Sequence, residues 1–359
     1  MMSNEDLYAL VEMAGHVGSR KLGVWPPNLG DPRPNAEVGI ASDSRLAGLG
    51  KGDAVLVIAT DLEEEAPIWF LQVKGAADRG ALVIVANMRA TKLDRYAAQT
   101  VRYPFGGAVE VLNSLTATTL GRKWLDRDLI QGRVDGFDAL AAALKGTRQP
   151  WKEVAEALAR AENLVIFAGN DGLDADGHTA LLQAAANFLI VTGHVGRHNN
   201  GLVPVWPGAN TQGAFDLGFS AAATRAMLQN PPAVLVIAGA DVAYDPAGAR
   251  ALDAAGFVID LTLFPDATAD QADVVLPIQS FAEREGTFTN AMRRVQRFYQ
   301  AHGPVGQALP GWEAIALVGA RIGMARPRLG PALVMKAMAE KVSLYREMSY
   351  PALARVEQQ

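Results

Sequence analysis

The sequence predicts an α/β protein built from two related, doubly wound parallel-sheet units with a C-terminal helix. The six residues Ala-Val-Leu-Val-Ile-Ala occur twice, at 54–59 and again at 233–238. A second apolar run follows each copy, LVIVA at 82–86 and FVID at 257–260. Short runs that are rich in β-branched residues and bounded by turn residues are typical of strands buried on both faces of a parallel sheet.

The other elements follow from the same patterning. Residues 4–15 form a helix capped by Ser3 or Asn4, whereas the Pro- and Gly-rich stretch at 24–35 is irregular. A helix joins strands 54–60 and 81–87. The elements predicted after them are a helix at 110–125, a polar connector at 126–149, a helix at 151–163, a strand at 164–170, a buried helix at 179–193, a glycine-dense loop at 193–218, a second strand–helix–strand unit from 232 to 300, and helices at 311–323 and 331–347.

Length and patterning together predict the domain boundaries. A chain of 359 residues is long enough for two domains with cores of their own. We place the first α/β unit, with its N-terminal helix and connector, at 1–150 and the second at 151–325. The second unit is expected to be incomplete without an upstream segment. Residues 326–359 are predicted to form a helical tail.

Composition excludes several classes of function. The net charge of −5 and the absence of a Lys/Arg cluster argue against nucleic-acid binding. The acidic N-terminus is unlike a secretory signal, and no apolar stretch is long enough to cross a bilayer, so we expect a cytoplasmic chain. Because the chain contains no cysteine, it can supply no thiolate ligand to zinc or to an iron–sulfur cluster, and no cysteine nucleophile.

Two familiar kinds of site do not fit the sequence. Neither predicted unit carries GxGxxG after its strand, and three consecutive glutamates, Glu63 to Glu65, follow the first one. A simple NAD-binding domain is therefore not expected. His194 and His198 are four residues apart, but the glycines around them predict a loop rather than one helix face, so we expect no metal site there.

The most polar loop in the second unit follows the strand at 272–277. It holds acids, hydroxyls, an amide and arginines between residues 281 and 296. Open α/β sheets place ligands at the carboxyl ends of their strands, so this loop is a candidate binding segment. The alternative from physical chemistry alone is that Glu283, Glu285 and Arg294 pair with one another and brace the loop.

These residues resemble a known family. The run ADVVLP at 272–277 with SFAEREGTFTN at 280–290 is similar to a signature of the molybdopterin oxidoreductase superfamily, whose members share two related α/β domains. The loop at 85–91 resembles that family's Asp-Pro-Arg-x-Thr loop, and 193–218 resembles its glycine-rich central loop. Within the superfamily, residues 89–97, 210–214 and 285–290 are most similar to the large subunit of respiratory complex I, the NADH-quinone oxidoreductase.

Departures from the family pattern predict a pocket that has lost its cofactor. Asp-Pro-Arg has become Asn87-Met88-Arg89, the acid of a second loop is replaced by Ala108, and no cysteine ligand is present. We therefore expect no catalytic residue, no metal and no cofactor in this chain, with iron–sulfur clusters and FMN carried by partner subunits. The candidate residues of a vestigial pterin cleft are Asn87, Arg89, Thr91, Asn210, Gln212, Glu285, Thr289, Asn290 and Arg294.

The resemblance implies a structural or assembly subunit, or a fragment of that large subunit, in the peripheral arm of an NADH-quinone oxidoreductase. Such a chain supports electron transfer from NADH to quinone without a redox centre of its own. It is expected to dock on an iron–sulfur-bearing chain and to reach the cytoplasmic side of the membrane only through that complex, because the family's N-terminal iron–sulfur part and C-terminal domain are not matched. The alternative is a molybdopterin-guanine-dinucleotide-binding part of a formate-dehydrogenase-like oxidoreductase. A third class is a stand-alone α/β protein that binds a small molecule.

Overall fold

The computed structural model describes residues 1–359 apart from 1, 42, 121–129, 131–133, 326–327 and 357–359. The chain divides into two compact units, one formed by residues 28–207 and the other by 1–27 together with 208–359. This division differs from the boundaries predicted at 150 and 325. The strand at 164–168 pairs with the strand at 54–58, so one sheet spans the predicted first boundary.

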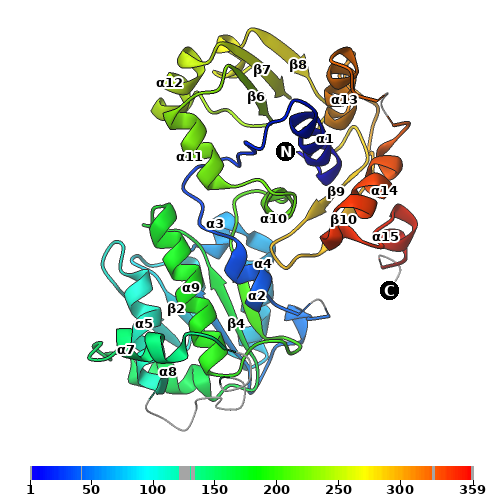
Figure 1. Ribbon diagram of the computed structural model, residues 1–359. Coiled ribbons are helices and arrows are strands. Elements are labelled where there is room, and N and C mark those ends of the chain that lie inside the picture. The colour runs from blue at the N-terminus through cyan, green and yellow to red at the C-terminus, as the bar shows by residue number, and fades with distance from the viewer. Residues whose placement is uncertain (1, 42, 121–129, 131–133, 326–327, 357–359) are drawn as a thin grey trace. The chain divides into compact units, whose positions relative to one another are not determined.

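The unit of residues 28–207 is built on one five-stranded sheet (Figure 1). All its strand pairs are parallel. The strands are β1 (Ala54–Ile58), β2 (Leu82–Ala86), β3 (Gln99–Val101), β4 (Leu164–Ala168) and β5 (Gly201–Pro204), in the order β3-β2-β1-β4-β5. Its helices are α2 (Arg33–Val38), η1 (Leu46–Gly48), α3 (Leu62–Glu65), α4 (Pro67–Asp78), η2 (Lys92–Tyr96), α5 (Ala108–Leu120), α7 (Phe137–Ala143), α8 (Lys152–Ala159) and α9 (Ala175–Val191).

This order is that of a doubly wound sheet. From the central neighbours β1 and β4, the chain proceeds outward to β2 through α4 and to β5 through α9. Right-handed crossovers in opposite directions place the two helices on opposite faces. The central strands β1 and β4 are accordingly apolar along their length, and all five residues of each are buried.

The other unit contains a smaller parallel sheet and a hairpin (Figure 1). Its sheet strands are β6 (Val234–Ala238), β7 (Phe257–Thr262) and β8 (Val274–Pro277), in the order β6-β7-β8, and β9 (Gly286–Thr289) pairs antiparallel with β10 (Val295–Phe298). Its helices are α1 (Asn4–His16), α10 (Thr211–Asp216), α11 (Ala221–Gln229), α12 (Pro246–Ala254), η3 (Ala269–Gln271), α13 (Gly311–Arg321), α14 (Pro331–Lys341), η4 (Ser343–Tyr345) and α15 (Tyr350–Val356).

The predicted fold class is confirmed, because both copies of the repeated sequence form strands in parallel sheets. The prediction that both copies are buried on both faces is wrong. Among the described residues β6 pairs with β7 alone, and its Val234 is 55% exposed. Val55, at the same place in the first copy, is fully buried.

Several smaller predictions can be compared with the structure. Ser3 caps α1 as expected, through a capping box with Asp6. The predicted terminal helix at 331–347 is interrupted, since α14 ends at Lys341 and η4 follows. The predicted helix at 110–125 is present as α5 up to Leu120, and its last residues lie outside the described part of the chain. None of the helices in the described ranges has the length and apolarity that a bilayer crossing requires.

Candidate functional site

The candidate site lies at the topological switch point of the five-stranded sheet. Connections leave the neighbouring strands β1 and β4 in opposite directions, and open α/β sheets bind ligands beyond the carboxyl ends of strands at such a point. The residues that follow these strands are Thr60 and Asp61 after β1, and Asn170 and Asp171 after β4. Asn87 and Arg89 follow β2, the next strand along. Polar side chains of three strand ends are therefore brought to one edge.

Arg89 connects two carboxylates at this edge. Its Nη1 donates to Asp61 Oδ2 at 2.9 Å, and its Nη2 lies 3.5 Å from Asp171 Oδ2. These two acids raise the pKa of the guanidinium further, through its hydrogen bond to Asp61 first and the charge of Asp171 after it. The side chain of Arg89 is half exposed, whereas that of Asp61 is 8% exposed.

Asn87 holds the loops that carry these acids. Its side-chain nitrogen donates to the Thr60 carbonyl at 3.2 Å and to Asp171 Oδ2 at 3.3 Å. Its side-chain oxygen accepts from the backbone N–H of Arg89 at 3.2 Å. A single amide thus ties together the ends of β1, β2 and β4.

The three consecutive glutamates do not all face this edge. Glu65 turns back and accepts from the Thr60 hydroxyl at 2.7 Å and from the Asp61 backbone N–H at 2.8 Å. Partial burial, together with the nearby acids, raises the pKa of Glu65. Glu63 instead pairs with Lys92 at 2.7 Å, away from the loop that Glu65 supports.

The two strand ends approach each other very closely. Ala59 adopts a positive φ of 53°, and a Cβ built on Gly169 would lie 2.6 Å from both the Ala59 carbonyl oxygen and the Thr60 Cβ. A side chain at residue 169 would therefore push β1 and β4 apart. Gly169 therefore allows the loops bearing Asp61 and Asp171 to lie side by side.

One acceptor at this edge remains unused. Asp61 Oδ1 is buried and has no hydrogen-bond partner among the described residues. Leaving a buried acceptor unpaired costs about 1–3 kcal/mol. Asp61, Glu65 and Asp171 also outnumber the one arginine, so the edge suits ligand O–H and N–H donors and disfavours phosphate.

Of the predicted cleft residues, the structure brings Asn87 and Arg89 to this edge. Thr91 lies a few residues further on, where it caps η2 and its hydroxyl donates to Asp94 at 3.2 Å. The other six, Asn210, Gln212, Glu285, Thr289, Asn290 and Arg294, belong to the unit that contains the smaller sheet.

Those six residues lie among structural contacts of that unit. The Asn210 side chain accepts from the Thr289 N–H at 2.7 Å and donates to the Met2 carbonyl at 2.9 Å. Gln212 donates to Asp216, and Asn290 donates to Gln296 and accepts from the backbone of Arg294. These hydrogen bonds hold the loops of this unit in place.

The bracing pattern itself differs from the one proposed from sequence. Glu285 pairs with Arg297 at 3.1 Å, and Glu283 accepts backbone N–H groups of Ser280 and Val305 at 2.7 Å. Arg297 thus takes the place beside Glu285 that was expected for Arg294. The loop is held by a cross-strand ion pair and by its own backbone.

Sequence reasoning missed Asp61 and Asp171 as site residues. Each lies a few residues after a buried strand, and this position in the sequence is the feature that could have identified both as site residues. The glutamates beside Asp61 make this loop unfavourable for a phosphate, and they hide its carboxylate as a candidate ligand for other groups. His194 is buried with both ring nitrogens hydrogen-bonded, and His198 pairs with Asp43 at 3.3 Å. Within the part of the chain that is described, no group of three or more His, Cys, Asp or Glu side chains is arranged for a metal ion.

Comparison with known proteins identifies the family to which this chain belongs. Residues 1–321 match the family described as molybdopterin oxidoreductase. The chain is 26% identical over 365 residues to the F420-dependent formate dehydrogenase 2 subunit alpha of Methanococcus maripaludis, covering 87% of this chain and 54% of that protein. It is 26% identical to the NADPH-Fe(3+) oxidoreductase subunit alpha of Geobacter sulfurreducens, covering 86% of this chain and 42% of that protein.

Solved structures agree at the level of fold. Acetylene hydratase from Pelobacter acetylenicus superposes with a TM-score of 0.73 and 15% identity, over 97% of this chain and 57% of that one. The chain therefore spans about half the length of the relatives it matches. At this identity the structural likeness speaks for the fold alone.

These findings test the expectations drawn from the sequence about family and cofactor. The resemblance to the molybdopterin oxidoreductases is confirmed, whereas the narrower assignment to the large subunit of complex I is not shown, since the relatives are formate-dehydrogenase-like. The expectation that this chain has no cofactor is wrong. A match over residues 1–321 implies that the chain binds molybdopterin.

Proposed function

Because the chain belongs to the molybdopterin oxidoreductase family, we propose that it is the molybdopterin-guanine-dinucleotide-binding part of a formate-dehydrogenase-like oxidoreductase. The bound cofactor would supply the redox chemistry of the assembled enzyme. The residues of this chain would bind and orient its guanosine end at the switch point of the five-stranded sheet.

The unpaired Asp61 Oδ1 is the observation that carries this proposal. A nucleoside offers ribose hydroxyls and, in guanine, ring and exocyclic N–H groups, all of which are donors. A carboxylate at the end of a strand in an open α/β sheet is a common partner of such groups. A ligand donor at Asp61 would remove the cost of the unpaired acceptor.

The neighbouring residues fit supporting roles. Asp171 is partly exposed and offers a second carboxylate beside the first. Asn87 and Arg89 hold both acids in place and leave half of the Arg89 side chain free to contact a ligand. Since the chain has no cysteine, a thiolate ligand to the metal of the cofactor would have to come from elsewhere.

The cofactor proposal predicts a selective loss on changing Asp61. Chain purified from a host that makes the guanine dinucleotide form should release GMP and an oxidised, fluorescent pterin on acid treatment. Asp61→Ala should reduce both by about tenfold, since one charge-assisted hydrogen bond contributes about 1.5–3 kcal/mol. The measurement is GMP and pterin per mole of protein.

Glu64→Gln is the matched control. Glu64 is exposed and close to Asp61 in sequence, and its side chain has no hydrogen bond to the strand-end loops in the described part of the chain. This variant should retain the cofactor at the level of the unchanged chain. If the unchanged chain carried neither GMP nor pterin while a known molybdoenzyme was loaded in the same cells, the proposal would be refuted.

We further propose that an iron–sulfur-bearing polypeptide is the redox partner. A chain without cysteine cannot hold such a cluster through thiolates, so electrons would leave or reach the cofactor through another protein segment. A tag on this chain should co-purify a protein with iron and acid-labile sulfide. Isolation as a monomer without a redox partner would contradict this. Association with a membrane through that partner stays a prediction.

A further inference from the structure

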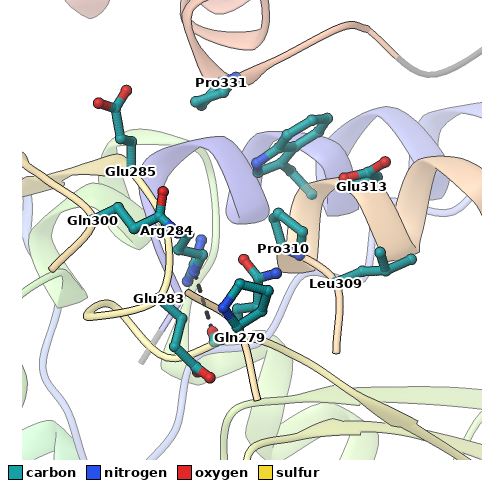
Figure 2. Close-up of a pocket in the computed structure, with 11 residues that line it drawn as sticks. Gln279, Glu283, Arg284, Glu285, Gln300, Leu309, Pro310, Glu313 and Pro331 are labelled. Carbon is teal, nitrogen blue, oxygen red and sulfur yellow. Dashed lines mark hydrogen bonds between the residues drawn. The ribbon is translucent and has the colours of Figure 1, made fainter. Parts of the chain in front are cut away.

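A surface cavity of about 350 Å³ lies in the unit formed by residues 1–27 and 208–359. Its lining comes from the segment 279–285, from Gln300 and Pro304, from the segment 309–313 and from Pro331 (Figure 2). Cavities of this size are large enough to hold a small molecule or one long side chain. No residue of the cofactor site lines it.

The charges around this cavity leave an excess of negative charge. Arg284 lines it, but its guanidinium forms an ion pair with the Asp6 carboxylate, with 2.7 Å between Nη2 and Oδ2. Glu285 is balanced in the same way by Arg297. Glu283 and Glu313 remain as lining carboxylates without a cationic side chain in the ion pairs of the described residues. Backbone N–H groups lower the pKa of Glu283, which keeps it ionised.

The two glutamines of the lining each offer an acceptor. One side-chain N–H of Gln279 donates to the Ala308 carbonyl at 2.8 Å. One side-chain N–H of Gln300 donates to the His302 carbonyl at 3.0 Å. The side-chain oxygen of each amide, together with its second N–H, is left to meet a ligand. Together with the Glu313 carboxylate, these oxygens favour a ligand that donates several hydrogen bonds.

One donor in the lining is also unsatisfied. Trp312 is 95% buried, lines the cavity, and has an indole Nε1–H with no partner among the described residues. Its neighbours Leu309, Pro310 and Pro331 supply apolar wall. The ligand that complements this set has a cationic head, an apolar stem and one hydrogen-bond acceptor.

We propose that this cavity binds a lysine or arginine side chain of a partner polypeptide. The methylene stem would pack on the prolines and Leu309, the cationic head would be held by Glu313 and the glutamine oxygens, and a backbone carbonyl of the partner would accept from Trp312. Ammonium and guanidinium groups carry the positive charge that complements Glu283 and Glu313, and their N–H groups can donate to the amide oxygens. The inference does not rest on the cofactor proposal, since the two sites share no residue.

The test uses small probes on the full chain. N-acetyl-arginine amide and N-acetyl-lysine amide carry the cation, the stem and the carbonyl, and N-acetyl-glutamine amide lacks the charge. Calorimetric titration at low ionic strength should give about tenfold tighter binding of the basic probes, and added salt should weaken it. Equal binding of all three probes, or binding of none, would overturn the proposal.

Variants assign the binding to this cavity. Glu313→Gln should weaken the basic probes about fivefold, and Glu313→Lys should abolish their binding. Glu340→Gln, an exposed acid on α14 outside the lining, should bind as the unchanged chain does. Circular dichroism checks that each variant folds. Putrescine binding more tightly than the amide probes would reject a polypeptide in favour of a free amine.

Discussion

Replacing Asp6 with alanine should destabilise the protein by about 3–5 kcal/mol, because it leaves a buried guanidinium without its counter-charge. Asp6 and Arg284 are 0% and 2% exposed at the side chain and lie 2.7 Å apart. Asp6 also accepts the backbone N–H groups of Ser3 and Trp312 at 2.7 Å. The loss should appear as a lower urea midpoint followed by circular dichroism.

An exposed ion pair provides the control for this prediction. Arg33 pairs with Asp31 at the surface, and its side chain is 81% exposed. Arg33→Ala should leave the urea midpoint nearly unchanged, since water screens the pair. The combined replacement Asp6→Leu with Arg284→Met should lose less than the two single changes added together. If Asp6→Ala proved as mild as Arg33→Ala, the buried pair would contribute no more to stability than a surface pair does.

Replacing Asp260 with asparagine should stabilise the protein above pH 7. Asp260 lies in the middle strand β7, is fully buried, and both its carboxylate oxygens lack partners in the described part of the chain. Burial, followed by the charges of Asp266 and Asp241, raises the pKa of this carboxyl from 3.8 to about 6. The native state therefore holds the proton more tightly than the unfolded chain does.

The sign of the pH effect follows from that difference. The contribution of Asp260 to stability is fully present below pH 3.8 and is lost as the pH rises through 6. A shift of this size corresponds to about 3 kcal/mol, which is the upper limit of the gain expected for Asp260→Asn at pH 8. The gain should be small at pH 4. Urea midpoints at both pH values measure it.

Asp253→Asn is the control for Asp260. Asp253 is an exposed acid on α12, next to the same sheet. Its replacement should not change the difference in midpoint between pH 4 and pH 8. A stability gain for Asp260→Asn that was equal at both pH values would show that its charge is not the cause.

The prediction that the chain has no cofactor came from the sequence of single loops. The family pattern has an acid at the position of Asn87, and its absence there indicated an abandoned pocket. In the folded protein Asn87 contacts Asp171, which lies 84 residues away in sequence. Carboxylates from the ends of β1 and β4 therefore stand beside the amide. Spatial neighbours of this kind cannot be found from local spacing.

Local sequence determined which segments become strands and helices. Apolar β-branched runs, an N-cap residue at Ser3 or Asn4 and the helix periodicities predicted most elements correctly. Tertiary structure alone decided how each element is used. The same six residues form β1, paired on both sides, and β6, paired with β7 among the described strands. Val55 is fully buried and Val234 is 55% exposed, because burial depends on the neighbours of a strand and not on its own sequence.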